Sequence, residues 1–285
     1  MAKIIRKRTL NELVKLYEVD APRIAKKAQH GQFVIVRIDE SGERIPLTIS
    51  DTDTDRGTVT FIAQEVGKTT RQLGGLNEGD ELQTVVGPLG RPTHFESDVK
   101  NAIVIGGGLG SAIAYPQSKH LFLRGAHVDT IVGFRNKGLV ILEEELKAVS
   151  TRLIVTTDDG SYGLKGFVTE ALKTLLESGV KYDAVVAIGP PIMMKVVCGM
   201  TQPYGVYTLV SLNPIMVDGT GMCGCCRVTV GGKTRFACID GPDFNGHEVD
   251  FDELMKRNTM YREQEKISLD RHICKLAEAE REAGS

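Results

Sequence analysis

The sequence predicts a β-barrel followed by an α/β domain. In chain order, these are a small antiparallel barrel, a doubly wound parallel sheet, and a short cysteine-rich module with a helical tail. Three observations support this fold class. Short strand-like runs separated by glycines fill about the first 97 residues. From residue 101 onward, apolar strand patterns alternate with helical patterns. Four of the six cysteines then fall between residues 223 and 238.

The barrel is expected to occupy residues 1–98. Its strands are predicted at 32–38, 44–49, 57–63 and 81–86. Each run is rich in β-branched residues, and glycines lie at the breaks between the runs. Regularly spaced short strands of this kind are typical of a small antiparallel barrel. We also expect a helix at residues 69–76 and a turn at residues 87–90, Gly-Pro-Leu-Gly, leading to the next domain.

The second domain is expected at residues 99–212. Its strands are predicted at 102–105, 128–132, 152–156, 183–188 and 207–210. Helices are predicted between them at 112–125, 142–149, 166–177 and 192–199. This alternation indicates a parallel sheet with helices on both faces. The third unit, residues 213–285, holds the clustered cysteines and two polar helical segments, 252–260 and 268–283.

Composition excludes several classes of protein. The 35 basic and 37 acidic residues give a net charge of −2, without the basic footprint of a nucleic-acid-binding protein. The most apolar stretch, residues 102–115, is too short to cross a membrane. The basic N-terminus lacks the apolar stretch of a signal peptide, and cysteines at metal-binding spacing favour a reducing compartment. We therefore expect a cytoplasmic protein with no nucleic-acid partner and no membrane span.

The cysteine-rich segment has the spacing of an iron–sulfur loop. A plant-type [2Fe–2S] loop reads C-x4-C-x2-C…C, and here Asp218 stands in the first position, followed by Cys223, Cys226 and Cys238. The glycines between them allow the backbone to wrap closely round a cluster. Structural zinc and a metal-free loop remain alternatives. Cys225 is surplus to the spacing, but it could replace Asp218 as the fourth ligand.

Three loops are predicted at the carboxyl edge of the parallel sheet, where ligands bind in such folds. The first follows a strand and opens a helix, so its glycines could let a pyrophosphate approach the helix N-terminus. A tight turn without a ligand explains that loop alone equally well. The candidate dinucleotide-binding residues in the three loops are Gly106, Gly108, Gly110, Asp158, Asp159, Gly189 and Pro190.

A second candidate phosphate loop lies in the barrel half. Gly67, Lys68, Thr69 and Thr70 precede a predicted helix, and their amides, hydroxyls and cation could hold a pyrophosphate. A plain helix start with a threonine N-cap is the simpler explanation when the segment is taken alone. The sequence offers no nucleophile–base pair, so we expect no catalytic side chain and chemistry that comes from cofactors.

The order of barrel, nucleotide domain and cysteine loop resembles the ferredoxin–NADP reductase superfamily. The resemblance covers essentially the whole chain and is carried by residues 43–48, 64–70, 86–90, 157–163 and 218–238. It is closer to the electron-transfer subunits of bacterial dihydroorotate dehydrogenase. It is closest to the small (alpha) subunits of NADH-dependent ferredoxin–NADP oxidoreductase, the electron-bifurcating transhydrogenase also known as sulfide dehydrogenase. The dihydroorotate-type subunits usually have cysteine where Asp218 stands.

The resemblance implies FAD in the barrel. Pro46, Leu47 and Thr48 stand where the superfamily places R-P-Y-[ST] against the flavin, with Arg44 one position earlier as a candidate phosphate contact. Ile45 replaces the motif's arginine and Leu47 its tyrosine, so those ring contacts do not carry over. Residues 67–70 match the family's pyrophosphate loop. The resemblance implies NAD(H) in the second domain, although NADP(H) stays possible because Arg135 and Lys137 could meet a 2′-phosphate.

We therefore expect a flavin and iron–sulfur subunit of an oxidoreductase. It would exchange hydride with NAD(H) at FAD and pass electrons through a [2Fe–2S] cluster to a larger flavin and [4Fe–4S] subunit, with ferredoxin reached indirectly. Electron-bifurcating, NADH-dependent ferredoxin:NADP⁺ reduction, a transhydrogenation, is the activity that the resemblance implies. The electron-transfer subunit of dihydroorotate dehydrogenase is the alternative enzyme. A non-catalytic, nucleotide-responsive protein with structural zinc is the alternative from another class.

Overall fold

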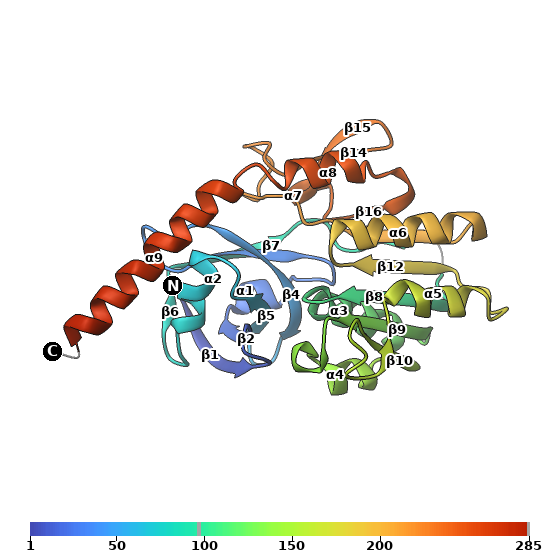
Figure 1. Cartoon of the computed structure of the whole chain (residues 1–285), viewed down its shortest axis with the longest axis horizontal. Helices are drawn as coiled ribbons and strands as arrows, with labels where there is room; N and C mark the ends of the chain where they lie inside the picture. The colour runs from blue at the N-terminus through green and yellow to red at the C-terminus, as the bar shows by residue number, and fades with distance from the viewer. Residues whose placement is uncertain (96–97, 284–285) are drawn as a thin grey trace.

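Two seven-stranded sheets and one hairpin make up the architecture (Figure 1). The structure is a computed structural model that describes residues 1–95 and 98–283, with side chains described up to residue 274. The antiparallel sheet lies beside the parallel sheet, and the hairpin with α7 and α8 lies above them in the view of Figure 1. The predicted fold class is therefore confirmed.

The first sheet is an antiparallel, nearly closed barrel with strand order β6-β1-β2-β5-β4-β3-β7. Its strands are β1 Ala2–Thr9, β2 Val14–Asp20, β3 Phe33–Arg37, β4 Ile45–Asp53, β5 Thr58–Gln64, β6 Glu81–Leu82 and β7 Thr84–Leu89. Two helices, α1 Pro22–Ala25 and α2 Lys68–Gly75, accompany them. Tyr17 and Phe61 stack in the barrel core at 5.6 Å, and the Tyr17 hydroxyl donates to the Leu73 carbonyl, which fixes α2 on the barrel.

The prediction of a turn at residues 87–90 is wrong. Gly87, Pro88 and Leu89 belong to β7, where Leu89 pairs with Phe33 of β3. A proline fits there because β7 is an edge strand, and the register of its pairing shifts next to this point. The signal that suggested a turn was thus the signature of an irregular edge strand.

The second sheet has the order β11-β10-β9-β8-β12-β13-β16. Its strands are β8 Asn101–Gly107, β9 His127–Phe134, β10 Arg152–Thr157, β11 Leu164–Lys165, β12 Ala184–Ile188, β13 Tyr207–Ser211 and β16 Asp243–Asn245. The helices are α3 Gly110–Leu123, α4 Glu143–Ala148, α5 Val168–Leu176 and α6 Pro191–Thr201, with 3₁₀ turns at Lys137–Leu139 and Gln202–Tyr204. All of its pairings are parallel except that of β16 with β13.

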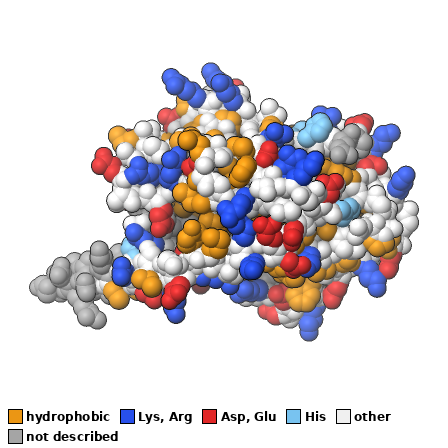
Figure 2. Space-filling model, turned by 90° about the horizontal axis from the view of Figure 1, so that it is seen from above, with side chains coloured by type: hydrophobic (Ala, Val, Ile, Leu, Met, Phe, Trp, Pro, Cys, Tyr) orange, Lys and Arg blue, Asp and Glu red, His pale blue; other side chains and the backbone are white. Residues whose placement is uncertain are grey.

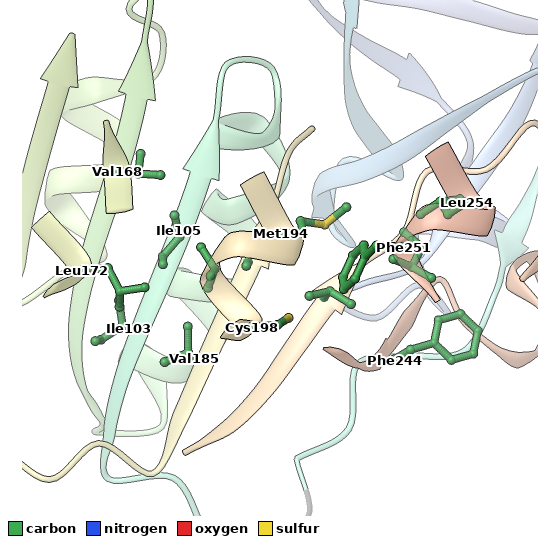
Figure 3. Packing of buried hydrophobic residues seen from close by; sticks show 14 of the residues in the cluster. Ile103, Ile105, Val168, Leu172, Val185, Met194, Cys198, Phe244, Phe251 and Leu254 are labelled. Carbon is green, nitrogen blue, oxygen red and sulfur yellow. The ribbon is translucent and has the colours of Figure 1, made fainter. Parts of the chain in front are cut away.

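The sheet is buried on both faces. Ile103 and Ile105 of β8 pack in the cluster that contains Leu172 of α5 and Met194 of α6 (Figure 3). Ala102 and Val104, which point the other way, pack with α3. Burial on both faces explains the continuous apolar runs that predicted these strands.

The third unit continues the same core. It contains β14 Arg227–Val230, β15 Lys233–Phe236, α7 Ala237–Asp240, the 3₁₀ turn Gly246–Glu248, α8 Phe251–Arg257 and α9 Arg262–Ala283. Phe244, Phe251 and Leu254 pack against α6 in the cluster that includes Ile105 (Figure 3). Helix α9 leaves this unit and runs past α2 (Figure 1). Among the described residues, no helix combines the length and apolar character that crossing a bilayer requires.

A buried polar junction ties the three units together. Thr93, which follows the barrel, donates its hydroxyl to the carboxylate of Asp243 on β16. Gln117 of α3 donates to Thr93 Oγ1 at 2.6 Å and to Asp243 Oδ2 at 3.2 Å. Asp243 Oδ1 and Gln117 Oε1 are buried acceptors without a donor among the described residues. Burial raises the pKa of Asp243 to about 6, and a protonated carboxyl would supply a donor to this junction.

Asp243→Asn is expected to remove much of the pH dependence of folding stability between about pH 4 and pH 6. Because the pKa of Asp243 is raised in the folded state, its contribution to stability is complete at low pH and is lost as the pH rises through about 6. Asparagine stays neutral, so the variant should exceed the wild type near pH 8 by about 2 kcal/mol. Free energies of urea unfolding across this pH range measure the effect. Equal pH profiles for the two proteins would contradict it.

Candidate cofactor sites

The predicted flavin residues lie on one side of the barrel. Pro46, Leu47 and Thr48 are on β4, where Pro46 pairs with Ile35 of β3. Arg44 is exposed in the preceding loop. The Thr69 hydroxyl donates to the Glu43 carboxylate, which joins this loop to the start of α2. The β4 segment and the Gly67–Thr70 segment, far apart in sequence, are therefore neighbours in the fold.

Both threonine hydroxyls of the second segment already have partners. Thr70 Oγ1 accepts from the backbone N–H groups of Gly67 and Val66 at 3.0 and 3.1 Å, and it caps α2. Thr69 Oγ1 donates to Glu43. The groups left to meet a pyrophosphate are the backbone N–H groups at the start of α2 and the Lys68 ammonium. The role of Glu43 could not be predicted from the sequence, because its partner lies 26 positions away.

The glycine loops meet at the switch point of the parallel sheet. β8 lies between β9 and β12, so the chain direction across the sheet reverses there, and ligand crevices form at such points. Gly106 lies at the end of β8, Gly108 lies in the loop that follows and Gly110 begins α3, whereas Gly189 and Pro190 lie in the loop after β12. The structure thus brings together two of the three predicted glycine segments at the switch point.

The two loops are in close contact. A Cβ added to Gly110 would lie 2.2 Å from the carbonyl oxygen of Ile188, and one added to Gly107 would lie 2.6 Å from Met193 Sδ. Gly108 has a φ of +56° and open space around it, so it can face a ligand. Gly110 is thus required by the close approach of the two backbones, and Gly107 by the Met193 side chain, in addition to any role in binding.

Asp158 and Asp159 lie on the neighbouring loop, after β10. Their backbone N–H groups donate to the carbonyls of Phe134 and Arg135, at the end of β9, at 3.0 and 3.3 Å. Both carboxylates are exposed, and hydrogen bonds from Ser161 lower the pKa of Asp159. Arg135 and Lys137 are exposed on the adjacent segment. This edge therefore presents both anionic and cationic side chains to solvent.

The cysteine loop contains one close, buried thiol pair. Cys226 Sγ and Cys238 Sγ are 3.1 Å apart, and the Cys238 backbone N–H donates to Cys226 Sγ at 3.5 Å. Burial and the neighbouring Cys226 raise the pKa of Cys238 to about 12. Two buried thiols in contact resist ionisation unless a bound cation compensates their charge, as a metal does for coordinating thiolates.

Asp218 and Cys223 form a second pair in the same loop. Asp218 Oδ2 accepts the N–H groups of Met222 and Cys223 at 3.1 and 3.0 Å, and Oδ1 accepts that of Thr220 at 3.0 Å. These bonds lower the pKa of Asp218 and show that the loop suits an anionic group. Within the described residues, no three such side chains already converge as a metal-binding group. The ligand set therefore stays a prediction.

The cysteine loop packs directly on the barrel. A Cβ added to Gly219 would lie 2.9 Å from Ile35 Cγ1 and 3.3 Å from Leu89 Cδ1. Ile35 is also the strand partner of Pro46. One residue of β3 thus lies between the predicted flavin segment and the predicted cluster loop.

Similarity to known proteins identifies the family. The chain is 48% identical over 277 residues to a Thermotoga maritima protein named dihydroorotate dehydrogenase B (NAD(+)), electron transfer subunit homolog, with 97% of both chains covered. The chain belongs to the family of dihydroorotate dehydrogenase B electron-transfer subunits. It is 52% identical over 272 residues to an uncharacterized protein from the adh 3′ region of Clostridium beijerinckii, covering 93% of this chain and 92% of that protein.

Two further similarities bear on the site. Residues 213–250 match the iron–sulfur cluster binding domain of dihydroorotate dehydrogenase B. The fold matches a chain of the NADH-dependent reduced ferredoxin–NADP oxidoreductase, solved for insight into flavin-based electron bifurcation. Identity is 46%, the TM-score is 0.90, and 96% of this chain and 98% of that chain are covered. The family resemblance predicted from the sequence is confirmed, and membership in this electron-transfer family indicates a redox role.

One cavity lies elsewhere. It has a volume of about 150 Å³ between the barrel and helices α3 and α4, and it contains none of the predicted site residues. Arg8 pairs with Glu145 at its edge, and Lys119 pairs with Asp51 at 2.8 Å. The cavity thus lies between the barrel and the parallel-sheet domain, which these ion pairs hold together. Neither the glycine loops nor the cysteine loop line it.

Gly110→Ala is expected to destabilise the protein by about 2 kcal/mol, because the new Cβ would meet the Ile188 carbonyl and push the two glycine loops apart. Gly199→Ala, in α6, is the matched control. Its added Cβ meets no atom within 4 Å, so it should stabilise by about 0.5 kcal/mol. Thermal unfolding of the three proteins tests the difference. A wild-type melting temperature for Gly110→Ala would show that the loops can separate freely.

Proposed function

We propose that this chain is the flavin and iron–sulfur electron-transfer subunit of an electron-bifurcating, NADH-dependent ferredoxin–NADP oxidoreductase. The full-length similarity to the structure of such an enzyme carries the proposal. The contact between the cysteine loop and the β4 partner strand supports it, because electron transfer between two cofactors requires them to lie close together. Bound FAD would supply the chemistry that links two-electron hydride transfer from NADH to single-electron transfer toward a [2Fe–2S] cluster.

The chain's own residues would bind and orient these groups. Backbone N–H groups at the start of α2, with Lys68, would hold the FAD pyrophosphate. Residues 44 to 48 would line the flavin, with Leu47 giving an apolar contact where relatives stack an aromatic ring. The Gly106–Gly110 and Gly189–Pro190 loops would hold NAD(H) in the switch-point crevice. The positioning of nicotinamide against flavin would set the rate, without a side-chain acid or base.

Asp218, with Cys223, Cys226 and Cys238, is the proposed ligand set. Asp218 accepts the backbone N–H of Cys223, and Cys226 contacts Cys238. Two ligands for each iron would account for this arrangement. Cys225 instead lines a pocket of about 80 Å³ with Arg227, Arg257 and Tyr261. A carboxylate is a harder ligand than a thiolate, so it should alter the potential of the cluster.

A larger flavin and [4Fe–4S] subunit is the proposed partner, and the cytoplasm is the proposed compartment. Met222 is 89% exposed, and Val217 and Ile239 are also exposed on the loop and α7. Figure 2, which views the molecule from above Figure 1, shows hydrophobic side chains gathered over this part of the molecule. Exposed apolar patches of this kind mark protein contacts. Contact here would place the next redox centre beside the cluster.

The first test is an anaerobic visible spectrum of the purified protein with iron, sulfide, zinc and flavin analysis. Bound FAD with equal amounts of iron and acid-labile sulfide is the expected result. Bleaching of the flavin by NADH would then support the nicotinamide site. A colourless protein that contains zinc would overturn the proposal and favour the structural-zinc alternative.

Cys226→Ala is expected to abolish the cluster, because it removes half of the buried thiol pair. Cys225→Ala is the matched control and should retain full iron and sulfide, since Cys225 is surplus to the C-x4-C-x2-C…C spacing. Iron and sulfide analysis and the visible spectrum measure both. A complete cluster in Cys226→Ala, or its loss in Cys225→Ala, would contradict the ligand set.

Asp218→Cys should keep the cluster and change its reduction potential, because a thiolate replaces a carboxylate on one iron. The direct alternative, an electron-transfer subunit of dihydroorotate dehydrogenase, usually has cysteine at this position. Potentiometry followed by electron paramagnetic resonance gives the midpoint of each protein. Identical potentials would remove Asp218 from the ligand set and leave Cys225 as the candidate.

A further inference from the structure

Arg257 is a partly buried cation beside the cysteine loop. It is the last residue of α8, and its Nη2 donates to the Cys225 carbonyl at 3.1 Å. Its Nε is buried and has no hydrogen-bond partner in the part of the chain that the structure describes. The guanidinium is thus aimed at the turn formed by residues 223–226.

No carboxylate neutralises this cation within residues 1–95 and 98–274. The ion pairs of that region leave out both Arg257 and its neighbour Arg227. Ile215, Met260 and Tyr261 line the same pocket, so much of the surrounding surface is apolar. A charge in such surroundings is costly unless an opposite charge lies nearby. The neighbouring group that would supply negative charge is the one predicted for the cysteine loop.

We propose that Arg257 is the counter-cation of the [2Fe–2S] cluster, holding the cysteine turn through the Cys225 carbonyl and raising the reduction potential of the cluster. This inference rests on the proposed function. Three thiolates and a carboxylate give the centre a net negative charge, which increases when one electron arrives from the reduced flavin. A nearby cation stabilises the reduced form more than the oxidised form. Arg257 is thus a positioning residue that acts through the turn and through its field.

Other cations near the loop are less suited to this role. Arg227 donates to the Gly224 carbonyl at 3.2 Å, but its side chain is exposed, so solvent screens its charge. Arg91 donates to the Ile239 carbonyl, is 70% exposed, and lies 3.9 Å from Asp240. Arg257 combines a carbonyl contact, a buried Nε and the lack of a described carboxylate partner. Its field should therefore be the least screened of the three.

The test compares Arg257→Gln, Arg257→Lys and wild type by reductive titration, with iron and sulfide analysis of each. In Arg257→Gln the equilibrium constant for cluster reduction should fall about tenfold, a shift of about 59 mV to lower potential for one electron. Arg257→Lys keeps the charge and should stay close to the wild-type potential. Arg235→Gln removes an exposed charge from β15, so it should leave the potential unchanged.

The outcomes separate this inference from the proposed function. A wild type without iron and sulfide would sink the proposed function itself. A loaded wild type with an unshifted Arg257→Gln potential would overturn the role of Arg257 and leave the function standing. If Arg257→Gln fails to retain the cluster, the iron and sulfide content of Arg257→Lys decides whether the positive charge is what the cluster requires. A loaded lysine variant supports the counter-cation, and an empty but folded one refutes it.

Discussion

Strand β3 is the element on which the arrangement of the three units depends. Val34 and Val36 point into the barrel core, whereas Phe33 and Ile35 belong to the core shared by the parallel sheet and the cysteine module. Because successive side chains on a strand alternate in direction, five residues join two cores without an intervening linker. The cysteine loop rests on Ile35 and Leu89, so its distance from β4 is set by packed side chains. Packed cores resist small displacements, which would keep the distance between the proposed cofactors constant.

The pairing of β16 with β13 supplies the second constraint. Three residues of the cysteine-rich unit add an antiparallel strand to the edge of an otherwise parallel sheet, and they carry Asp243 into the buried junction with Thr93 and Gln117. The cysteine module therefore contacts the barrel through the cysteine loop and the parallel sheet through β16. Movement of one unit would break hydrogen bonds at the junction and expose apolar surface at β3. The junction thus fixes the cysteine module to the barrel and to the parallel sheet, which carry the two predicted nucleotide sites.

Periodicity and spacing predicted most of the fold, because the cores of the β8, β9, β10 and β12 runs are rich in valine and isoleucine and glycine marks the loops after them. They could not predict β16, whose three residues have no pattern of their own and are ordered by β13. The segment 87–90 was misassigned because proline and glycine mark edge strands as well as turns. The spacing located the cysteine loop and its candidate ligands. It could not find Glu43 or Arg257, since both act on groups distant in sequence, 26 and 32 positions away.

The hydrogen-bonding needs of the backbone explain why arginines lie around the cysteine loop. A loop that wraps a negatively charged centre exposes its carbonyl oxygens on the outer side, because its N–H groups turn inward, as those of residues 220, 222 and 223 turn toward Asp218. Outward carbonyls need donors, and Arg227 and Arg257 provide them to Gly224 and Cys225. A guanidinium that satisfies a carbonyl also brings positive charge close to the centre inside. The backbone geometry that makes an anion-binding loop therefore favours arginine on its outer side, where the same residue would serve both local folding and the proposed tuning of the cluster.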